Sequence, residues 1–231
     1  MRTIQEHLIS VVIPALNEAE NLPGAVAQFA GGDPIHEIVV ADGGSGDATA
    51  ALAREAGARV VDAPRGRGSQ LAAGARSATG KWLLFLHADC RLGAGWETAV
   101  RAFVAVPQAA SRAGYFVFAL DDRAPAARWL ERVVRWRCRL LALPYGDQGL
   151  LIARTLYDAA GGYPAIPLME DVDMVRRLGR ARLRPIGATV IASARRYRRD
   201  GYWRRGMRNL FCLALYFLGV SPERIAKLYG R

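Results

Sequence analysis

A histidine and an aspartate two residues apart follow a run of apolar residues. The run 82–86 is apolar at every position and leads into His87-Ala88-Asp89. A continuous apolar run of this length is typical of a strand that is buried on both faces. Side chains two positions apart in an extended chain lie on the same face, so we expect His87 and Asp89 to point together. In an open α/β sheet, the ligand crevice lies beyond the carboxyl ends of the strands, so this pair could meet a metal-bound or phosphorylated ligand there. The alternative is that His87 and Asp89 simply open a surface loop.

Three other predicted strand ends also carry polar residues. Asn17 and Glu18 follow the first strand, Asp42 follows the second, and Arg65 and Arg67 follow the third. The carboxyl ends of parallel strands share one edge of the sheet, so these side chains should converge. Carboxylates can accept from a base N–H or ribose hydroxyls, and arginines between glycines at a helix start can approach phosphate oxygens. The set therefore predicts a nucleoside diphosphate site, in which Asp89 holds a divalent cation against the departing diphosphate.

Each of these residues also has a purely structural explanation. Asn17 can cap a helix, Asp42 can hold a turn, and the arginines can be solvated surface. The chain contains neither GxGxxG nor GxxxxGK[ST], so no dinucleotide fingerprint or P-loop supports a dehydrogenase or an NTPase.

Strand and helix patterns alternate through the first half of the chain. This order predicts an α/β fold with a mainly parallel, mixed sheet flanked by helices. The second half is less regular, and its strands need not be parallel. We expect a domain over 1–195 and a basic helical appendage over 196–231. The expected strands are 8–13, 37–41, 58–62, 82–86, 115–120 and 184–192, and the expected helices are 18–30, 48–56, 69–78, 97–104, 126–143 and 170–178.

The composition excludes a disordered or fibrous protein. The chain has 231 residues, 52% of them hydrophobic, and a net charge of +11. This charge indicates a polyanionic partner, which could be nucleic acid, anionic lipid or the diphosphate of a nucleotide. Cys90, Cys138 and Cys212 form no CxxC pair, which argues against a disulfide framework or a zinc cluster. The beginning of the sequence lacks a secretion signal pattern, and we expect a cytoplasmic protein.

The appendage joins a cluster of arginines to an apolar block over 210–220. Eleven residues are too few for a helix that crosses a bilayer, which needs roughly 20. Two interpretations fit the block: a segment on an anionic membrane surface, peripheral on the inner face, or a helix that completes the core and has a solvated basic side. Ser221-Pro222 predicts the start of a final helix.

An ordered set of motifs resembles those of family 2 glycosyltransferases. The similarity covers residues 8 to about 195 and implies a GT-A fold, an inverting mechanism, a nucleotide-sugar donor and Mn²⁺ or Mg²⁺. His87-Ala88-Asp89 is similar to a small bacterial subgroup in which His-Ala-Asp replaces Asp-x-Asp. The motifs are Val11-Val12-Ile13-Pro14-Ala15-Leu16-Asn17-Glu18, Ile38-Val39-Val40-Ala41-Asp42-Gly43-Gly44-Ser45, Phe85-Leu86-His87-Ala88-Asp89, Gly161-Gly162-Tyr163-Pro164 and Met169-Glu170-Asp171-Val172-Asp173.

The resemblance also assigns roles by position. His87 and Asp89 take the metal position, and Asp171 acts as general base on the acceptor hydroxyl, with Glu170 as the alternative base. A neutral imidazole suits Mn²⁺ better than Mg²⁺, so Asp89 should carry most of the metal affinity. The nucleoside pocket would be lined by Ala15, Asn17, Glu18 and Asp42, and the base and diphosphate would be approached by Arg65, Gly66, Arg67 and Gln70.

The remaining assignments concern the acceptor and the basic segment. We expect Asp147 and Gln148 to face the acceptor and Gly162 and Tyr163 to lie near the sugar, although Tyr163 fits a core position equally well. Without the preceding motif, Glu170, Asp171 and Asp173 could simply be an acidic first turn of a helix. The segment that would close over the diphosphate carries Arg195, Arg196, Arg198 and Arg199.

The main hypothesis is a glycosyltransferase that uses a nucleotide sugar, with uridine favoured because of Asp42, and an acceptor that the sequence does not identify. An alternative enzyme is a nucleotidyltransferase that acts on a sugar phosphate. The non-enzymatic alternative is a basic nucleic-acid-binding module. Under the main hypothesis we expect no nucleic-acid partner.

Overall fold

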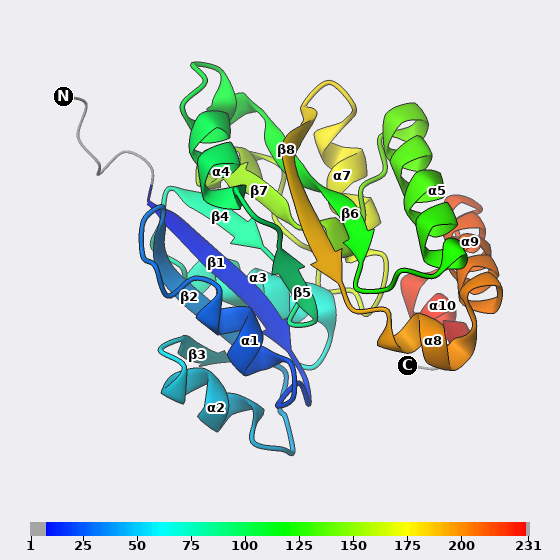
Figure 1. Cartoon of the computed structure of the whole chain (residues 1–231), viewed down its shortest axis with the longest axis horizontal. Helices are drawn as coiled ribbons and strands as arrows, with labels where there is room; N and C mark the ends of the chain where they lie inside the picture. Colours follow the sequence, from blue (N-terminus) through cyan, green and yellow to red (C-terminus); the bar gives the residue numbers. More distant parts are fainter. Residues whose placement is uncertain (1–7, 230–231) are drawn as a thin grey trace.

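The computed structural model describes residues 8–229 and contains one mixed sheet with helices on both faces (Figure 1). The predicted α/β class is therefore confirmed. The sheet has eight strands in the order β3-β2-β1-β4-β7-β6-β8-β5. They are β1 (Ile9–Ala15), β2 (Ile35–Asp42), β3 (Arg59–Asp62), β4 (Trp82–Phe85), β5 (Cys90–Leu92), β6 (Ala113–Leu120), β7 (Leu150–Ala153) and β8 (Leu183–Ala192).

The direction of the strands changes across the sheet. β3, β2, β1 and β4 are parallel, whereas β7 is antiparallel to both β4 and β6. β6 and β8 are parallel again, and β5 is antiparallel to β8. Because β1 pairs with β2 on one side and β4 on the other, the chain reverses its progress across the sheet at β1. A crevice is expected beyond the carboxyl ends of the strands at such a point.

The helices bury both faces of the sheet. In β1, Val11 and Ile13 pack on one face of the sheet and Val12 packs on the other. Because both faces are buried, the sequence of the strand is mostly apolar. The first face is covered by α1 (Leu22–Ala27), α2 (Thr49–Glu55), α4 (Trp96–Val104) and α5 (Pro125–Leu141), and the second by α3 (Arg67–Ser77), α6 (Arg154–Ala159) and α7 (Glu170–Leu178).

Three helices follow the last long strand and lie at one end of the molecule, beside α5 (Figure 1). They are α8 (Arg195–Asp200), α9 (Tyr202–Phe217) and α10 (Pro222–Tyr229). The predicted start of a final helix at Pro222 is confirmed. Among the described residues, the structure contains no helix that is long and apolar enough to cross a membrane.

Two local predictions are wrong. The chain turns at Ala88 and Asp89 instead of continuing extended, and Cys90 N donates to the carbonyl oxygen of His87 at 3.1 Å. Asn17 does not cap a helix, because α1 begins later and has Asn21 at its N-cap. Asn17 has a φ of 54°, a conformation that Asn tolerates better than most residues. Its Oδ1 accepts from Gly46 N at 2.9 Å, which ties the loop after β1 to the loop after β2.

Candidate active site

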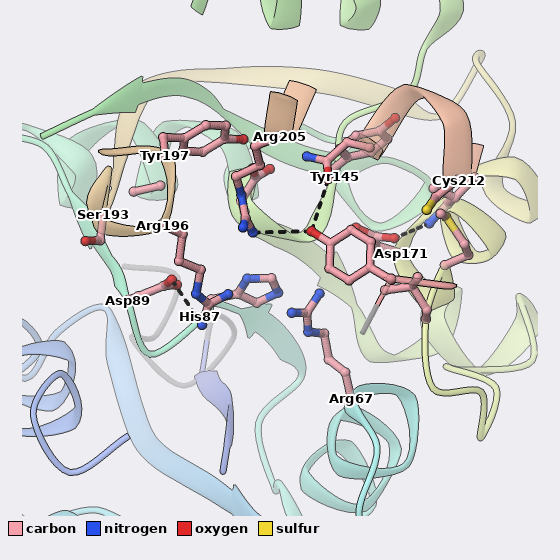
Figure 2. A pocket seen from close by; sticks show the side chains of 17 residues that line it. Arg67, His87, Asp89, Tyr145, Asp171, Ser193, Arg196, Tyr197, Arg205 and Cys212 are labelled. Atoms are coloured by element: carbon pink, nitrogen blue, oxygen red, sulfur yellow. Dashed lines mark hydrogen bonds and ion pairs between the residues drawn. The ribbon is translucent and has the colours of Figure 1, made fainter. Parts of the chain in front are cut away.

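A pocket of about 140 Å³ lies beyond the carboxyl end of β4, between α7 and the C-terminal helices (Figure 2). Seven separate parts of the chain contribute to its wall. The turn after β4 supplies His87 and Asp89, and α3 supplies Arg67. The other polar lining residues are Tyr145, Asp147, Asp171, Ser193, Arg196, Tyr197, Arg205, Asn209 and Tyr229.

His87, Asp89 and Cys90 could hold a metal ion, since one ligand atom of each lies within 4.8 Å of the others. Burial raises the pKa of the Cys90 thiol well above its usual range, and the neighbouring Asp89 raises it further. Of these donors, the imidazole and the carboxylate form a set that suits Mn²⁺ better than Mg²⁺.

Asp171 lies in the first turn of α7 and is held by two backbone donors. Gly146 N donates to Asp171 Oδ2 at 2.6 Å, and Val172 N donates to Oδ1 at 2.7 Å. A β-carbon on Gly146 would lie 2.7 Å from His87 Nε2 and 3.3 Å from Asp171 Oδ2. The absence of a side chain at this position therefore lets the predicted base and the predicted metal-site histidine approach the same point.

Glu170, the alternative base, lies behind Asp171. Its side chain is only 1% exposed, and its Oε1 lies 3.4 Å from Arg67 Nη1. Burial acts to lower the pKa of Arg67, but the carboxylates of Glu170 and Asp171 raise it above its ordinary value. Arg67 thus remains a cation in the wall of the pocket, where the sequence predicts it, and Glu170 supports that charge.

Asp147, which the sequence assigns to the acceptor, lines the same pocket. Its Oδ1 is buried and has no hydrogen-bond partner among the described residues. Burial raises the pKa of Asp147 to about 6, and the nearby Asp171 carboxylate adds to this effect. A carboxyl group that is partly protonated near neutral pH can donate as well as accept a hydrogen bond.

Two predicted ligand-binding glutamines are used by the fold instead. Gln70 is 4% exposed, and its Nε2 donates to the carbonyl oxygens of Ala15 at 2.5 Å and Ala41 at 3.2 Å. Gln148 is 2% exposed, and its Nε2 donates to Phe116 O at 3.1 Å. Neither amide lines the pocket: Gln70 satisfies two buried backbone carbonyls and Gln148 satisfies one, which would otherwise lack a partner.

Tyr163 lies in the core, which was one of the two positions that the sequence allowed for it. It is buried, and its ring packs edge-on against Phe85 with 4.8 Å between ring centroids. Tyr163 N donates to Tyr157 Oη at 3.0 Å. Gly162, with a φ of 66°, turns the chain just before this ring, and its carbonyl oxygen accepts from Arg177. Both residues therefore support the wall behind the site.

Asp42 ends β2 and is also buried. Its Oδ2 accepts from Ser45 N at 3.1 Å, and its Oδ1 accepts from Ser45 Oγ. Ala15 ends β1, and its carbonyl oxygen accepts from Gly43 N at 2.9 Å. Arg65 is exposed, and Gly66, with a φ of 133°, leads directly into α3. These residues surround the strand ends, but the pocket wall does not include them.

A second hollow adjoins the pocket on the side of β1. It is lined by Asn17 and Glu18 and shares Asp89, Ser193 and Arg196 with the pocket. Arg196 Nη2 lies 3.6 Å from Glu18 Oε1 and 3.9 Å from Asp89 Oδ2. The guanidinium therefore separates the predicted nucleoside residues from the predicted metal residues, and Figure 2 shows it beside Asp89 and His87.

The other three arginines of the basic segment do not line the pocket, although Arg195 lines the second hollow. Arg195 pairs with Glu20, Arg198 Nη1 lies 3.5 Å from Asp122 Oδ2, and Arg199 pairs with Asp200. Arg196 is thus the member of this group that lines the pocket.

The sequence analysis did not identify the part of the pocket formed by the C-terminal helices. Arg205, Asn209 and Cys212 lie on one side of α9 at i, i+4 and i+7, a spacing that could have indicated a shared polar or small face. Tyr229 on α10 also lines the pocket, and Arg205 Nη2 donates to its Oη at 3.2 Å. No local pattern marks Tyr229, because its position depends on how α10 folds back.

Comparison with known proteins finds a family model that matches the first half of the chain. Residues 10–105 match the model of glycosyl transferase family 2. An uncharacterized glycosyltransferase of Mycobacterium tuberculosis is 40% identical over 88 residues, which are 38% of this chain and 39% of that protein. A TPR repeat-containing protein of Synechococcus elongatus is 36% identical over 107 residues, 44% of this chain and 25% of that protein. The chain therefore matches well under half the length of these relatives.

Similarity to solved structures covers much more of the chain. Glucosyl-3-phosphoglycerate synthase from M. tuberculosis, in complex with Mn²⁺, UDP-glucose and phosphoglyceric acid, matches with a TM-score of 0.60 and 21% identity, over 93% of this chain and 80% of that one. Its complex with Mg²⁺ and UDP matches with a TM-score of 0.55 and 22% identity, over 81% of this chain and 70% of that one. The predicted GT-A fold and the predicted resemblance to family 2 glycosyltransferases are confirmed.

Proposed function

Starting from a GT-A fold whose residues 10–105 match glycosyl transferase family 2, we propose that this protein is an inverting glycosyltransferase. It transfers a sugar from a nucleoside-diphosphate sugar to an acceptor hydroxyl. A UDP-sugar is the favoured donor, because proteins of similar fold have been solved with UDP or UDP-glucose and Mn²⁺ or Mg²⁺. In this proposal, residues 1–195 form the transferase domain and residues 196–231 form a basic helical appendage.

The observation that carries the proposal is the meeting of Asp171 and His87 on either side of Gly146, with Asp89 in the same pocket. An inverting transfer needs a carboxylate that removes the acceptor proton as the acceptor oxygen attacks the anomeric carbon. That base must lie opposite the leaving diphosphate. Asp171 meets this requirement better than Glu170, because Asp171 lines the pocket while Glu170 is buried behind it in an ion pair with Arg67.

The donor is assigned to the side of the pocket toward β1. Glu18 and Asn17 would contact the nucleoside, within a frame set by Ala15 and Asp42 and braced by Gln70. Arg67 would face the diphosphate, while Arg65 and Gly66 lie at the start of the same helix. Charged hydrogen bonds from guanidinium groups to phosphate oxygens are stronger than neutral ones, and they offset charge that develops on the leaving group.

Arg196 is the arginine assigned to close over the diphosphate. It lies between Glu18 and Asp89, at the boundary of the two hollows. A diphosphate that spans the two hollows would take the place of these carboxylates as the partner of Arg196. Donor binding and the position of this side chain are therefore coupled in the proposal.

The metal position is assigned to His87 and Asp89. A divalent cation bound there supplies positive charge next to the departing diphosphate. The acceptor hydroxyl is assigned to the neighbourhood of Asp171 and Asp147, which line the same pocket.

The proposal is tested with purified protein and a panel of nucleotide sugars in Mn²⁺, in Mg²⁺ and without metal. We expect one donor to raise the melting temperature in the presence of metal and to be slowly hydrolysed. Absence of any response to the panel in either metal would contradict the proposal. Release of pyrophosphate from a nucleoside triphosphate and a sugar phosphate would instead support the nucleotidyltransferase alternative.

A further inference from the structure

The side of α5 that faces away from the sheet carries an exposed apolar stripe. Trp129, Val133, Trp136 and Leu140 follow one another at i, i+4, i+7 and i+11, so they lie along one line of the helix. Trp136 is 62% exposed and Leu140 is 49% exposed. Exposed tryptophans in such a line are unusual on a surface that faces only water.

α9 carries a second exposed stripe next to the first. Trp203 and Met207 are each 63% exposed, and Leu210 and Phe211 are almost equally so, at 59% and 58%. The rings of Trp129 and Trp203 lie 4.4 Å apart, centroid to centroid, which joins the two stripes. Figure 1 shows the two helices side by side at one end of the molecule. We call this surface the α5–α9 face; it consists of Trp129, Val133, Trp136, Leu140, Trp203, Met207, Leu210 and Phe211.

A line of arginines runs beside the apolar stripe on α5. Each lies one position before an apolar residue of the stripe, and all four are exposed: Arg128, Arg132, Arg135 and Arg139. The one acidic residue of α5, Glu131, is buried and accepts from Leu120 N at 2.8 Å. α9 carries three arginines and no acidic residue; Arg205 lines the pocket, Arg205 and Arg208 pair with Asp200, and Arg204 is exposed. Arg128 pairs with Glu131 at 2.8 Å, so Arg132, Arg135 and Arg139 supply the exposed positive charge of α5 beside the apolar side chains of the α5–α9 face.

We propose that the α5–α9 face docks on a membrane surface that contains anionic phospholipids. Amphipathic helices of this composition lie in the plane of the interface, with apolar side chains in the acyl boundary and basic side chains at the phosphates. Tryptophan favours this interface because its ring is apolar while its N–H can still meet water or lipid. The protein is peripheral in this arrangement and needs no spanning helix.

The charge of the face favours lipid over the other occupants. A symmetric dimer through this surface would bring the same arginines of two copies together, with no exposed acidic side chain on α5 or α9 to offset them. A nucleic acid would account for the arginines but not for the line of Trp136, Leu140, Met207 and Leu210. Anionic lipid accounts for both features.

The sequence left two interpretations of the apolar block over 210–220: a segment on a membrane surface or a helix that completes the core. Different sides of α9 fit each of them. Leu213 is buried in the core on the α7 side of the sheet, and Cys212 packs with Ile225 of α10. Leu210 and Phe211 lie on the exposed side of the helix. One side of the helix therefore completes the core, and the other side is available to a membrane.

The test is flotation of the full chain with vesicles of pure phosphatidylcholine and with vesicles that contain phosphatidylglycerol. We expect binding only to the anionic vesicles, and binding should weaken as salt is added because surface charges are screened. The double variant Trp136→Ser with Met207→Ser should lose binding. Arg132→Gln and Arg135→Gln should each weaken it about fivefold, since an interfacial arginine contributes about 1 kcal/mol and 1.4 kcal/mol is tenfold.

Two matched control variants lie on other surfaces. Val106 is an apolar residue 41% exposed, and Arg54 is an exposed arginine on α2. Val106→Ser and Arg54→Gln should bind vesicles as the unchanged protein does. Circular dichroism and the melting temperature of each variant establish that it is folded.

Two results would overturn the proposal. One is that the unchanged protein does not bind anionic vesicles, or binds them equally after the substitutions on the α5–α9 face. The other is a dimer in sedimentation analysis that the Trp136→Ser, Met207→Ser variant disrupts, without vesicle binding by either protein. That second result would make another copy of the chain the occupant of the face.

Discussion

The polar residues at the ends of β1 and β2 differ in their hydrogen bonding from the polar residues that the second half of the chain places in the pocket. Asn17 accepts from Gly46, Asp42 accepts from Ser45, and Gln70 donates to two carbonyl oxygens. In the second half, Asp147 has a buried oxygen without a hydrogen-bond partner among the described residues, and Asp171 is held by backbone donors while still lining the pocket. The first region is bonded internally, whereas the second presents groups to the pocket.

This difference separates the residues that hold the loops in place from the residues that are expected to react. Internal hydrogen bonds fix the loops after β1 and β2, so substitutions there should mainly lower the free energy of unfolding. The carboxyl groups of the pocket can still accept hydrogen bonds from a ligand, and holding them there costs stability. Substitutions of these groups should therefore mainly lower activity.

The largest expected effect is that of Asp171→Asn. Loss of the general base should lower the rate of transfer or donor hydrolysis by about 10²–10⁴-fold. Donor affinity, measured by calorimetry, should remain nearly unchanged, because the substitution preserves shape and acts on the acceptor side. A matching loss of donor affinity would assign Asp171 to donor or metal binding.

The matched control is Asp173→Asn in the same turn of α7. Asp173 pairs with Arg177 at 2.6 Å and does not line the pocket. Activity of this variant should stay close to that of the unchanged protein. Equal losses in both variants would indicate that the start of α7 acts only as structure.

Asp89→Ala should have the next largest effect. The substitution removes the only carboxylate of the predicted metal position, so Mn²⁺ affinity should fall by more than about tenfold, since even groups that only orient a metal ligand contribute 10–100-fold. Calorimetric titration of Mn²⁺, with and without UDP, measures this directly. His87→Asp should shift the preference from Mn²⁺ toward Mg²⁺, and an unchanged preference would exclude the imidazole as a ligand.

The first half of the fold could be predicted closely because local patterns specify it. β1 to β4 and α2 to α4 match the apolar runs and periodicities within a few residues. The prediction of α1 began too early, because Asn17 and Glu18 form a loop rather than the first helical turn. The short strands β5 and β7 were not predicted. β7 has only four residues, and its antiparallel place between β4 and β6 is set by tertiary pairing.

The candidate site could be predicted only where motifs lie at strand or helix ends. His87, Asp89, Arg67, Asp147 and Asp171 were all predicted and all line one pocket. Gln70 and Gln148 were assigned to ligands because an amide suits either role, and the sequence does not show which backbone carbonyls need a partner. Arg205 and Tyr229 could not be assigned, because α9 and α10 reach the pocket through tertiary packing.

Gln70→Leu tests whether Gln70 holds the ends of β1 and β2 in place. It should lower the free energy of unfolding by about 1–3 kcal/mol, because buried carbonyl acceptors lose a donor. Denaturant unfolding measures the change, and Gln108→Leu, at an exposed position, serves as the control. A Gln70→Leu protein of unchanged stability that no longer binds the donor would reverse the assignment and make Gln70 a ligand-binding residue.

A pH dependence of the free energy of unfolding is expected from Asp147. Burial raises its pKa to about 6, whereas a carboxyl group in an unfolded chain titrates near 4. Between these values the folded state holds a proton that the unfolded state releases, so rising pH favours unfolding. Relative to Asp147→Asn, the free energy of unfolding of the unchanged protein should fall from about pH 4 to about pH 6 and then level off. Parallel pH profiles of the two proteins would contradict this.

Proton NMR of the sugar released from UDP-glucose tests the central claim most directly. The donor is α-linked, and a base opposite the leaving diphosphate directs water to the other face of the anomeric carbon. The account predicts that β-glucose appears first and that α-glucose forms only later, as the anomers equilibrate. Early appearance of α-glucose, in a reaction that depends on metal and on Asp171, would contradict inverting transfer by this site.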